Sequence, residues 1–349
     1  MILMKFNGRH DNLGDRLIFS CLYNELKRYD KVEFFGSDKS DFIQSPLRFR
    51  EAFLKALKCY LKGQKVLVFH PPGARFLPRE AQKKSKAEKF RDKTTLLAWS
   101  LLRAELHIAG ISLGKEFDSQ HYKRFKSIGV RDKESQISLL DVGINANLCP
   151  DMAFLRPPKL PATARQNIMV SLRKETPDDY YDSAYSQLLK PAISLALEAC
   201  SMLESEICFF SNVEEDREFN VELVAELKTS GLPANYIEES PTDLDYSWFF
   251  RDNGVVISNR LHVLLPAMSE GVLPIALVSK DHYKVVNLFK TFGFEEFLVY
   301  VEEGAEIKDK VAHLLKYRGR LQKENYDKLC KLKRQVEAYL SSVVKDCGH

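Results

Sequence analysis

The sequence predicts an α/β protein of two Rossmann-like halves that face a cleft, followed by helices at the C-terminus. Three observations predict this class. Short apolar runs alternate with longer amphipathic runs, which is typical of strands and helices around parallel sheets. Three prolines within seven residues mark a break at 155–167 that divides this alternation into two series. A chain of 349 residues is also long enough for about two domains, each with its own core.

The first series predicts a domain over 1–160. Its apolar runs predict strands at 2–6, 31–36, 65–70, 105–110 and 126–130. Residues 15–29 repeat apolar side chains at helical spacing and predict an amphipathic helix. Residues 94–106 are apolar enough to predict a helix that is largely buried.

The second series predicts a domain over 161–307. Its strands are expected at 167–172, 206–211, 234–239, 254–258 and 273–278, with a helix around 184–204. A helical tail fills 308–349, and Gly319 is expected to divide it. Its apolar stripe comprises Leu329, Leu332, Val336, Leu340 and Val343. This stripe fits a terminal helix that docks on a domain, or a helix that binds a partner.

Composition narrows the class of protein. The net charge is +4, from 52 basic and 48 acidic residues, which is too mild for a dedicated nucleic-acid-binding protein. No stretch has the length of a signal-peptide core or of a membrane-spanning helix. The seven cysteines include no CxxC pair, and the eight histidines form no ligand pair. We therefore expect reduced thiols, a cytoplasmic protein and no metal site.

The most informative chemistry follows the strand GVVIS at 254–258. Arg260 and His262 come directly after it, where a parallel strand leads into a helix. Ligands of α/β proteins bind at such carboxyl ends, and an arginine beside a helix N-terminus favours an anion. The alternative is an arginine in a structural ion pair, with Asp252 as the candidate partner, and a histidine satisfied within the core.

Other strand exits carry matching polar residues. Arg173 follows the first strand of the second half, and Arg131 precedes Asp132 after a strand of the first half. Asp151 lies in a turn, where it could act as a cap. These charges favour an anion site over an isolated structural arginine.

Near the N-terminus, Asn12, Gly14 and Asp15 come just before a helix, and Asp15 could be its N-cap. Gly14 alone is a weak signal for a phosphate loop. The sequence contains no GxGxxG or Walker pattern, which argues against dinucleotide oxidoreductases and P-loop enzymes.

These segments in this order resemble the polysaccharide pyruvyl transferase family over roughly residues 6–300. The resemblance rests on NLGDRLI, GVRDKES, CPDMAF, VSLR and ISNRLHVLLPAMSEGVLPIALVSKDHYK. It implies a fold similar to the GT-B glycosyltransferases. It also implies transfer of a pyruvyl group from phosphoenolpyruvate to sugar hydroxyls, which forms a ketal on a cell-surface polysaccharide or its lipid-linked precursor. Phosphoenolpyruvate is then the donor substrate, and no cofactor is implied.

The resemblance also implies roles for individual residues. The family's arginine and histidine fall on Arg260 and His262, and its other basic residues fall on Arg173 and Lys280. Arginine and lysine suit the carboxylate and phosphate of phosphoenolpyruvate, and histidine suits a general acid that protonates its methylene. Asp15 is the first candidate for the carboxylate that orients or deprotonates the acceptor hydroxyl, and Asp132 and Asp151 are the next candidates.

The remaining candidates are substrate contacts, namely Asn12, Gly14, Arg131, Asp151 and His70. His70 lies in VFHPPGARF, where the family usually has a glycine-rich run and this chain keeps only Gly73. His70 is either an acceptor contact or a structural histidine. Arg16 replaces the acidic residue that usually follows the N-terminal Gly-Asp.

The stretch QKKSKAEKFRDK at 82–93 has six basic and two acidic residues. It fits a solvated segment, or a peripheral contact with a membrane surface or polyanion at the inner face of the cell membrane. Two further functions stay open. A GT-B glycosyltransferase that uses a nucleotide sugar would share the fold, and a non-catalytic sugar-binding relative would be expected to lack Arg260 or His262.

Overall fold

The computed structural model describes the chain except residues 6–11, 37–45, 76–85, 115, 162–165, 175–183, 204, 240–245 and 346–349. The chain forms two compact α/β units, each built on a parallel sheet, as predicted. The first contains Met1–His10, Ile18–Leu155 and Arg334–His349, and the second contains Asp11–Leu17 and Arg156–Lys333. No helix among the described residues is long and apolar enough to cross a membrane.

The sheet of the first unit follows the order β2-β1-β3-β5-β6-β7, and β4 pairs with β5. Its strands are β1 (Ile2–Lys5), β2 (Val32–Phe35), β3 (Leu67–His70), β4 (Gly73–Arg75), β5 (Glu105–Leu113), β6 (Ser127–Val130) and β7 (Asn147–Leu148). Its helices are α1 (Leu13–Leu26), α2 (Phe49–Leu61), α3 (Lys86–Leu101), α4 (Ser119–Tyr122) and α5 (Lys133–Asp141). The strand order reverses between β1 and β3, which is where doubly wound sheets bind ligands.

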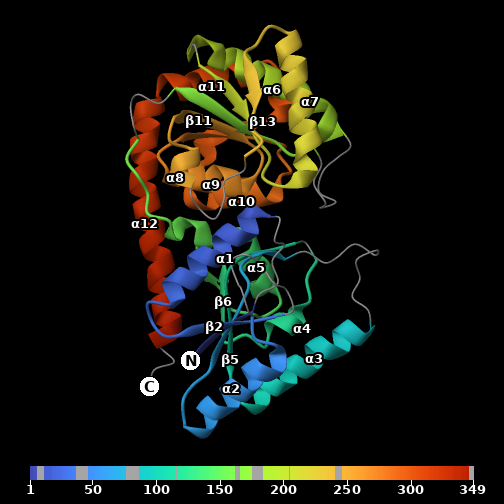
Figure 1. The fold of residues 1–349 in the computed structure, drawn as a ribbon, viewed down its shortest axis with the longest axis vertical. Helices are drawn as coiled ribbons and strands as arrows, with labels where there is room; N and C mark the ends of the chain where they lie inside the picture. The colour runs from blue at the N-terminus through green and yellow to red at the C-terminus, as the bar shows by residue number, and fades with distance from the viewer. Residues whose placement is uncertain are drawn as a thin grey trace. The chain divides into compact units, whose positions relative to one another are not determined.

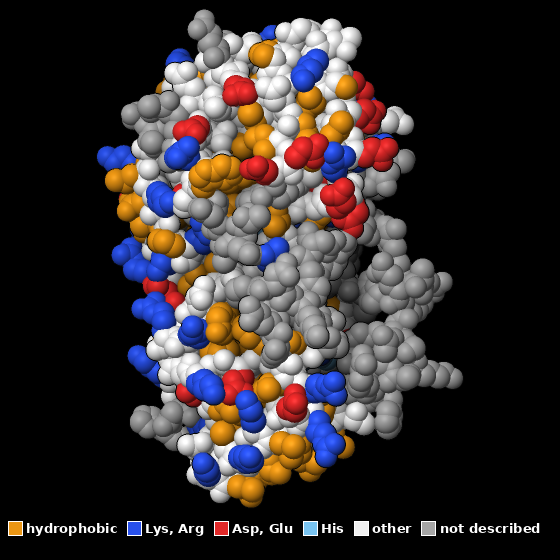
Figure 2. Space-filling view, in the orientation of Figure 1, with side chains coloured by type: hydrophobic (Ala, Val, Ile, Leu, Met, Phe, Trp, Pro, Cys, Tyr) orange, Lys and Arg blue, Asp and Glu red, His pale blue; other side chains and the backbone are white. Residues whose placement is uncertain are grey.

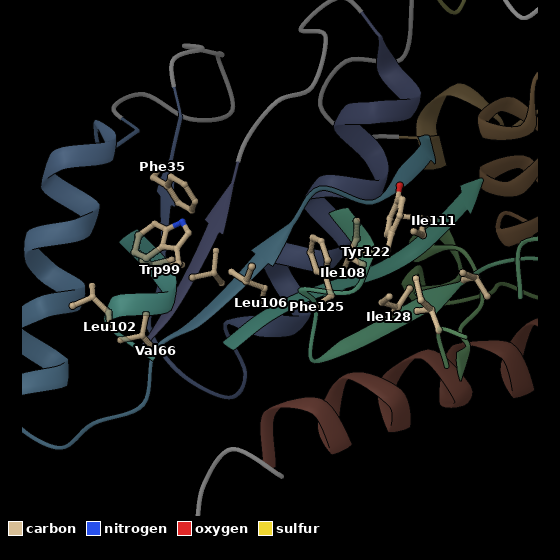
Figure 3. Close-up of a cluster of buried hydrophobic side chains, with 14 of the residues drawn as sticks. Phe35, Val66, Trp99, Leu102, Leu106, Ile108, Ile111, Tyr122, Phe125 and Ile128 are labelled. Atoms are coloured by element: carbon tan, nitrogen blue, oxygen red, sulfur yellow. The ribbon is translucent and has the colours of Figure 1, made fainter. Parts of the chain in front are cut away.

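The core of the first unit is built around Trp99 of α3. Trp99 is 1% exposed and meets Phe35 of β2 and Phe49 of α2 at ring distances of 5.5 and 5.3 Å. Figure 3 shows Trp99 next to Phe35. The prediction that the helix at 94–106 is largely buried is therefore right for the face of α3 that carries Trp99. It is wrong for the opposite face, where Leu97 and Leu101 are 61% and 68% exposed. A helix that packs one face on a sheet leaves side chains four residues apart on the other face in solvent.

The sheet of the second unit follows the order β10-β9-β8-β11-β12-β13, and all its pairs are parallel. Its strands are β8 (Asn167–Ser171), β9 (Ile207–Phe209), β10 (Ala234–Tyr236), β11 (Asn253–Ser258), β12 (Leu273–Val278) and β13 (Leu298–Tyr300). Its helices are α6 (Ala184–Cys200), α7 (Arg217–Thr229), α8 (Tyr246–Phe249), α9 (Leu261–Ser269), α10 (Tyr283–Phe292) and α11 (Glu306–Lys316). Figure 1 shows α6 and α11 on one side of this sheet and α9 and α10 on the other. The order reverses between β8 and β11, so the exits of these two strands form the switch point.

The Pro-rich linker is held against the second unit at the C-terminal end of α9. Arg156 and Lys159 form ion pairs with the buried carboxylate of Glu270 at 2.9 and 2.7 Å. Gly271 has a φ of +78°, and a Cβ there would lie 2.9 Å from Pro161. The turn after α9 therefore needs glycine and fixes the course of the linker.

The C-terminal segment is helical, as predicted, and ends in α12 (Arg318–Lys345). All five residues of the predicted apolar stripe are buried, which fits the docked helix. Its outward side carries Lys and Arg side chains, visible along the left edge of Figure 2. The predicted division at Gly319 is wrong by two residues. The helices separate at Tyr317, whose φ and ψ of −101° and 13° are not helical, and Gly319 lies in the first turn of α12.

Candidate functional site

The exits of β8 and β11, on either side of the switch point, are joined through the side chain of Asn259. Its Oδ1 accepts a hydrogen bond from the Arg173 backbone N–H at 2.9 Å, and its Nδ2 donates to the Arg173 carbonyl at 2.8 Å. The same Nδ2 lies 2.7 Å from the Tyr185 hydroxyl of α6. Asn259 is 3% exposed, so its bonds are made away from water, where hydrogen bonds are strong. The backbone of Arg173 is thereby fixed beside that of Arg260.

Ser258 makes a second connection between the same strands. Its Oγ donates to the Ser171 carbonyl at 2.5 Å and accepts from the Arg260 backbone N–H at 3.0 Å. Ser258 and Asn259, the two residues before Arg260, therefore both form hydrogen bonds that connect the ends of β8 and β11 at the switch point.

His282 extends this network to the exit of β12. It is the N-cap of α10, and its Nδ1 accepts from the Val285 backbone N–H at 3.4 Å. Its Nε2 lies 2.9 Å from the Asn259 carbonyl, so the neutral tautomer that donates from Nε2 satisfies both contacts. Burial lowers the pKa of His282 to about 3, and the charges of Lys284 and Arg173 act in the same direction. His282 is therefore a neutral structural residue near neutral pH.

Arg260 precedes the first turn of α9 and is 12% exposed. Its guanidinium forms an ion pair with Asp216, which ends a short 3-10 helix (Glu214–Asp216) after β9. The Asp252 partner considered from the sequence is wrong, because Asp252 is 71% exposed and lies 3.6 Å from Arg251. Among the described residues, the buried Nε of Arg260 has no hydrogen-bond acceptor.

Arg260 places a guanidinium group at the N-terminus of α9, beside a buried carboxylate. Burial raises the pKa of the Asp216 carboxyl, while the positive charges of Arg260 and then Arg173 act to lower it. Two guanidinium groups thus act on one buried carboxylate, and the negative charge of the neighbouring Glu215 opposes them. An anion that approaches this helix N-terminus would meet both a guanidinium donor and the helix dipole.

His262 lies two residues further along, at a kink in α9. Its φ and ψ of −86° and 16° are not helical. Pro266 explains the kink, since a proline ring clashes with the carbonyl of the residue four positions earlier, here His262. The imidazole is therefore carried by a backbone that the proline holds outside the regular helix.

Gly14 lies in the first turn of α1, which belongs to the second unit up to Leu17, while the rest of the helix belongs to the first unit. Gly14 lies against His262. A Cβ at position 14 would be 2.5 Å from His262 Nδ1 and 2.8 Å from its Cβ. No other residue fits without moving the imidazole. The N-terminal glycine considered as a weak phosphate-loop signal therefore has a specific steric role beside the candidate acid.

Asn12, rather than Asp15, caps α1. Asn12 Oδ1 accepts from the backbone N–H groups of Gly14 and Asp15 at 3.0 and 3.4 Å. The N-cap interpretation of Asp15 is therefore wrong, and its carboxylate lies within the first turn of α1 instead. Asn12, Gly14, Asp15 and His262 thus belong to the same unit as Arg173 and Arg260.

Lys280 follows β12 and is exposed. Its backbone N–H donates to the Glu302 carboxylate at 3.2 Å, and the Ser279 hydroxyl donates to the same group at 2.6 Å. This turn fixes the Lys280 backbone, while the side chain stays accessible to a ligand.

Arg131 and Asp151 lie in the other unit and pair with each other. Their side chains are 1% and 0% exposed. Arg131 also donates to Ser112 at 2.8 Å, and Asp151 accepts from the Ala153 backbone N–H at 2.9 Å, which is the cap considered from the sequence. A solvated substrate does not reach side chains buried to this extent. We therefore treat Arg131 and Asp151 as structural and keep them out of the proposed ligand site.

Asp132 and His70 are also engaged within the first unit. Asp132 caps α5 by accepting a hydrogen bond from the Ser135 backbone N–H at 2.7 Å, and it accepts a second one from the Ser112 hydroxyl at 2.5 Å. His70 ends β3, is 8% exposed, and packs nearly perpendicular to the Phe125 ring with 4.8 Å between the ring centroids. This placement fits the structural interpretation of His70 better than the acceptor contact. The stretch at 82–93 has no described side chains.

Removing the Asp151 carboxylate should destabilise the protein severely. Asp151→Ala leaves the Arg131 guanidinium buried without its partner, and we expect a loss of about 3–5 kcal/mol in unfolding free energy, measured by urea denaturation. Glu238→Ala is the matched control, because it breaks the exposed pair with Arg217 and should change stability by less than about 1 kcal/mol. Equal effects of the two substitutions would contradict the structural role of Asp151.

Comparison with known proteins identifies the family. The sequence profile of the polysaccharide pyruvyl transferases matches residues 12–281. The chain belongs to the polysaccharide pyruvyl transferase family. The match contains Arg173, Asn259, Arg260, His262 and Lys280 together with the segment of α1 that contacts His262, and it ends one residue before His282. This pyruvyl transferase family member therefore carries most of its candidate site within the shared region. No curated protein matches the chain.

Solved structures place the fold of this family member among GT-B enzymes. A glycosyltransferase from Rickettsia africae has 12% identity and a TM-score of 0.60 over 99% of this chain and 98% of its own. A trehalose-phosphate synthase from Burkholderia vietnamiensis has 10% identity and a TM-score of 0.56, with 99% and 98% covered. A UDP-GlcNAc 2-epimerase from Neisseria meningitidis has 11% identity and a TM-score of 0.55, with 99% and 100% covered. At these identities the likeness shows the fold alone.

Six residues of the site were not predicted, namely Tyr185, Asp216, Ser258, Asn259, His282 and Glu302. Asn259 and His282 lie within the segment that carries the resemblance, beside the predicted Arg260 and Lys280. Their position after buried strands was the available signal. Asp216 and Tyr185 had none, because their contacts join segments more than 40 residues apart in the chain.

Proposed function

We propose that this protein transfers a pyruvyl group from phosphoenolpyruvate to one or more hydroxyls of a saccharide, as part of building a cell-surface polysaccharide or its lipid-linked precursor. The observation that carries the proposal is the placement of Arg173 and Arg260 at the switch point, where Asn259 joins their backbones. Two arginines match a donor that carries both a carboxylate and a phosphate. Lys280 is the third cation in the proposed donor site.

His262 is the proposed general acid. It donates a proton to the methylene carbon of phosphoenolpyruvate, so that the adjacent carbon gains oxocarbenium character and a sugar hydroxyl adds to it. Asp15 accepts the hydroxyl proton in this scheme. Phosphate then leaves with the electrons of its C–O bond. A second hydroxyl on the same sugar takes its place and closes the ketal, and its proton passes to His262, which restores the acid. Arg260 and Arg173 stabilise the anionic groups throughout.

The second candidate is glycosyl transfer from a nucleotide sugar. It is favoured by the GT-B-like fold, since solved neighbours include a glycosyltransferase and an enzyme bound to UDP-GlcNAc. In that case Arg260 and Arg173 would bind the diphosphate. Because one fold supports several chemistries, the donor must be identified by binding.

Thermal unfolding with candidate donors separates these functions. Phosphoenolpyruvate at 100 times its dissociation constant should stabilise the native protein by about 2.7 kcal/mol and raise the unfolding midpoint by several degrees. Inorganic phosphate, UDP and GDP are the comparison ligands. Stabilisation by phosphoenolpyruvate beyond phosphate supports pyruvyl transfer, and phosphate release with sugar acceptors would then test the reaction. Stabilisation by a nucleoside diphosphate alone would overturn the proposal in favour of glycosyl transfer.

A further inference from the structure

The outward faces of α2 and α3 in the first unit expose large apolar side chains. Leu54 and Leu61 of α2 are 46% and 74% exposed, and Leu97 and Leu101 of α3 are 61% and 68% exposed. Single exposed leucines are common on protein surfaces, but four on two neighbouring helices form a patch that indicates an interaction site.

These leucines cannot turn inward, because the other faces of both helices are already packed. Trp99 of α3 meets Phe49 and Phe53 of α2 at ring distances of 5.3 and 6.3 Å. Ala52 and Ala56 of α2 are fully buried. The two helices therefore lie against each other and present their leucines outward, which we call the α2–α3 face. Figure 2 shows apolar side chains beside Lys and Arg side chains, with Asp and Glu side chains among them, in its lower part, where Figure 1 places these helices.

The segment that contains α2 carries a larger positive charge excess than the whole chain. Residues 48–65 contain six basic residues and one acidic residue, a net of +5, while the whole chain has +4. The rest of the chain thus sums to −1. The exposed basic residues are Arg48, Arg50, Lys55, Lys58, Lys62 and Lys65. Lys55 pairs with Glu33, and Glu51 accepts a hydrogen bond from the Arg48 backbone.

We propose that the α2–α3 face docks on an anionic membrane surface. The exposed leucines would enter the boundary between head groups and acyl chains, and Arg50, Lys58 and Lys62 would contact the anionic head groups. A second copy of this chain is a poor occupant, since self-association would bring two strongly basic surfaces together. A soluble polyanion would use the charge but leave the leucines in water.

Helix α5 shows that exposed apolar residues alone do not define this face. Ile137 and Leu140 are 57% and 60% exposed. Their helix carries one basic residue, Lys133, against Glu134 and Asp141. It therefore lacks the charge that would attract an anionic surface and provides a matched control in the same unit.

Vesicle co-sedimentation of the full chain tests the proposal without any substrate, so its result does not depend on the proposed reaction. The protein should bind vesicles of equimolar phosphatidylglycerol and phosphatidylcholine, and bind pure phosphatidylcholine much more weakly. Leu61→Ser with Leu101→Ser should weaken binding by at least about tenfold. Lys58→Glu with Lys62→Glu should weaken it by about 30-fold or more, because each basic residue contributes about fivefold. Leu140→Ser and Lys331→Glu, both at exposed positions elsewhere, should leave binding unchanged.

Three outcomes would overturn the proposal. One is the absence of binding to the anionic vesicles. Another is an equal loss of binding in Leu140→Ser or Lys331→Glu. The third is binding to a soluble polyanion such as heparin at the same affinity, with the leucine variants indistinguishable from the wild type, which would indicate a polyanion site. The unfolding midpoints of the variants serve as the control. If they are unchanged, a loss of binding does not come from a folding defect.

Discussion

Replacing His262 with alanine is expected to lower the turnover of the proposed reaction by about 10²–10⁴-fold, the usual contribution of a general acid. Binding of phosphoenolpyruvate should be mostly retained, because Arg260 and Arg173 provide the charges in the proposed donor site. The two effects separate in a comparison of kcat for phosphate release with the midpoint shift caused by phosphoenolpyruvate. A loss confined to kcat is the signature of a group that acts in the transition state.

His313→Ala is the matched control for this experiment. His313 is an exposed histidine of α11, also in the second unit, and its replacement should leave kcat unchanged. If His262→Ala turned over at the wild-type rate, the acid would have to be another residue. A loss of phosphoenolpyruvate binding equal to the loss of turnover would instead make His262 a binding residue.

The sequence was sufficient to predict the α/β class and most strands of both sheets, because apolar periodicity directly reports which segments are buried. It did not predict β4, β7 or β13, which have only two or three residues each, fewer than the about five or six of a typical strand. It also misjudged Leu97 and Leu101, because an apolar run indicates that a segment is buried but does not show which of its faces is buried.

The candidate site was predicted only in part, for a similar reason. Arg260, His262 and Arg173 were predicted because a polar residue directly after an apolar strand can be recognised in the sequence alone. Asp216 was not predicted, and Gly14 was predicted as a substrate contact but not as a neighbour of His262, because both contacts depend on the fold. Position 14 illustrates the difference, since the sequence shows a glycine and the structure shows that its missing Cβ leaves room for the His262 ring. The resemblance located the site, and packing supplied the reason for each residue in it.

Replacing Arg260 with alanine should affect both stability and donor binding. The substitution leaves the Asp216 carboxylate buried without its partner, and we expect a loss of about 3–5 kcal/mol in unfolding free energy. It also removes a guanidinium from the proposed donor site, so the midpoint shift with phosphoenolpyruvate should shrink to that seen with phosphate. Arg251→Ala, which breaks the exposed pair with Asp252, is the control and should change stability by less than about 1 kcal/mol.

A double substitution separates the two roles of Arg260. Arg260→Met with Asp216→Asn removes both charges while keeping most of the side-chain volume, so much of the lost stability should return. Donor binding should not return, because Arg260 is still absent. Asp216→Asn alone should keep or strengthen phosphoenolpyruvate binding, since the buried carboxylate competes with the donor for the same guanidinium. If the double variant bound phosphoenolpyruvate as the wild type does, Arg260 would serve the fold and the anion would have to be bound elsewhere.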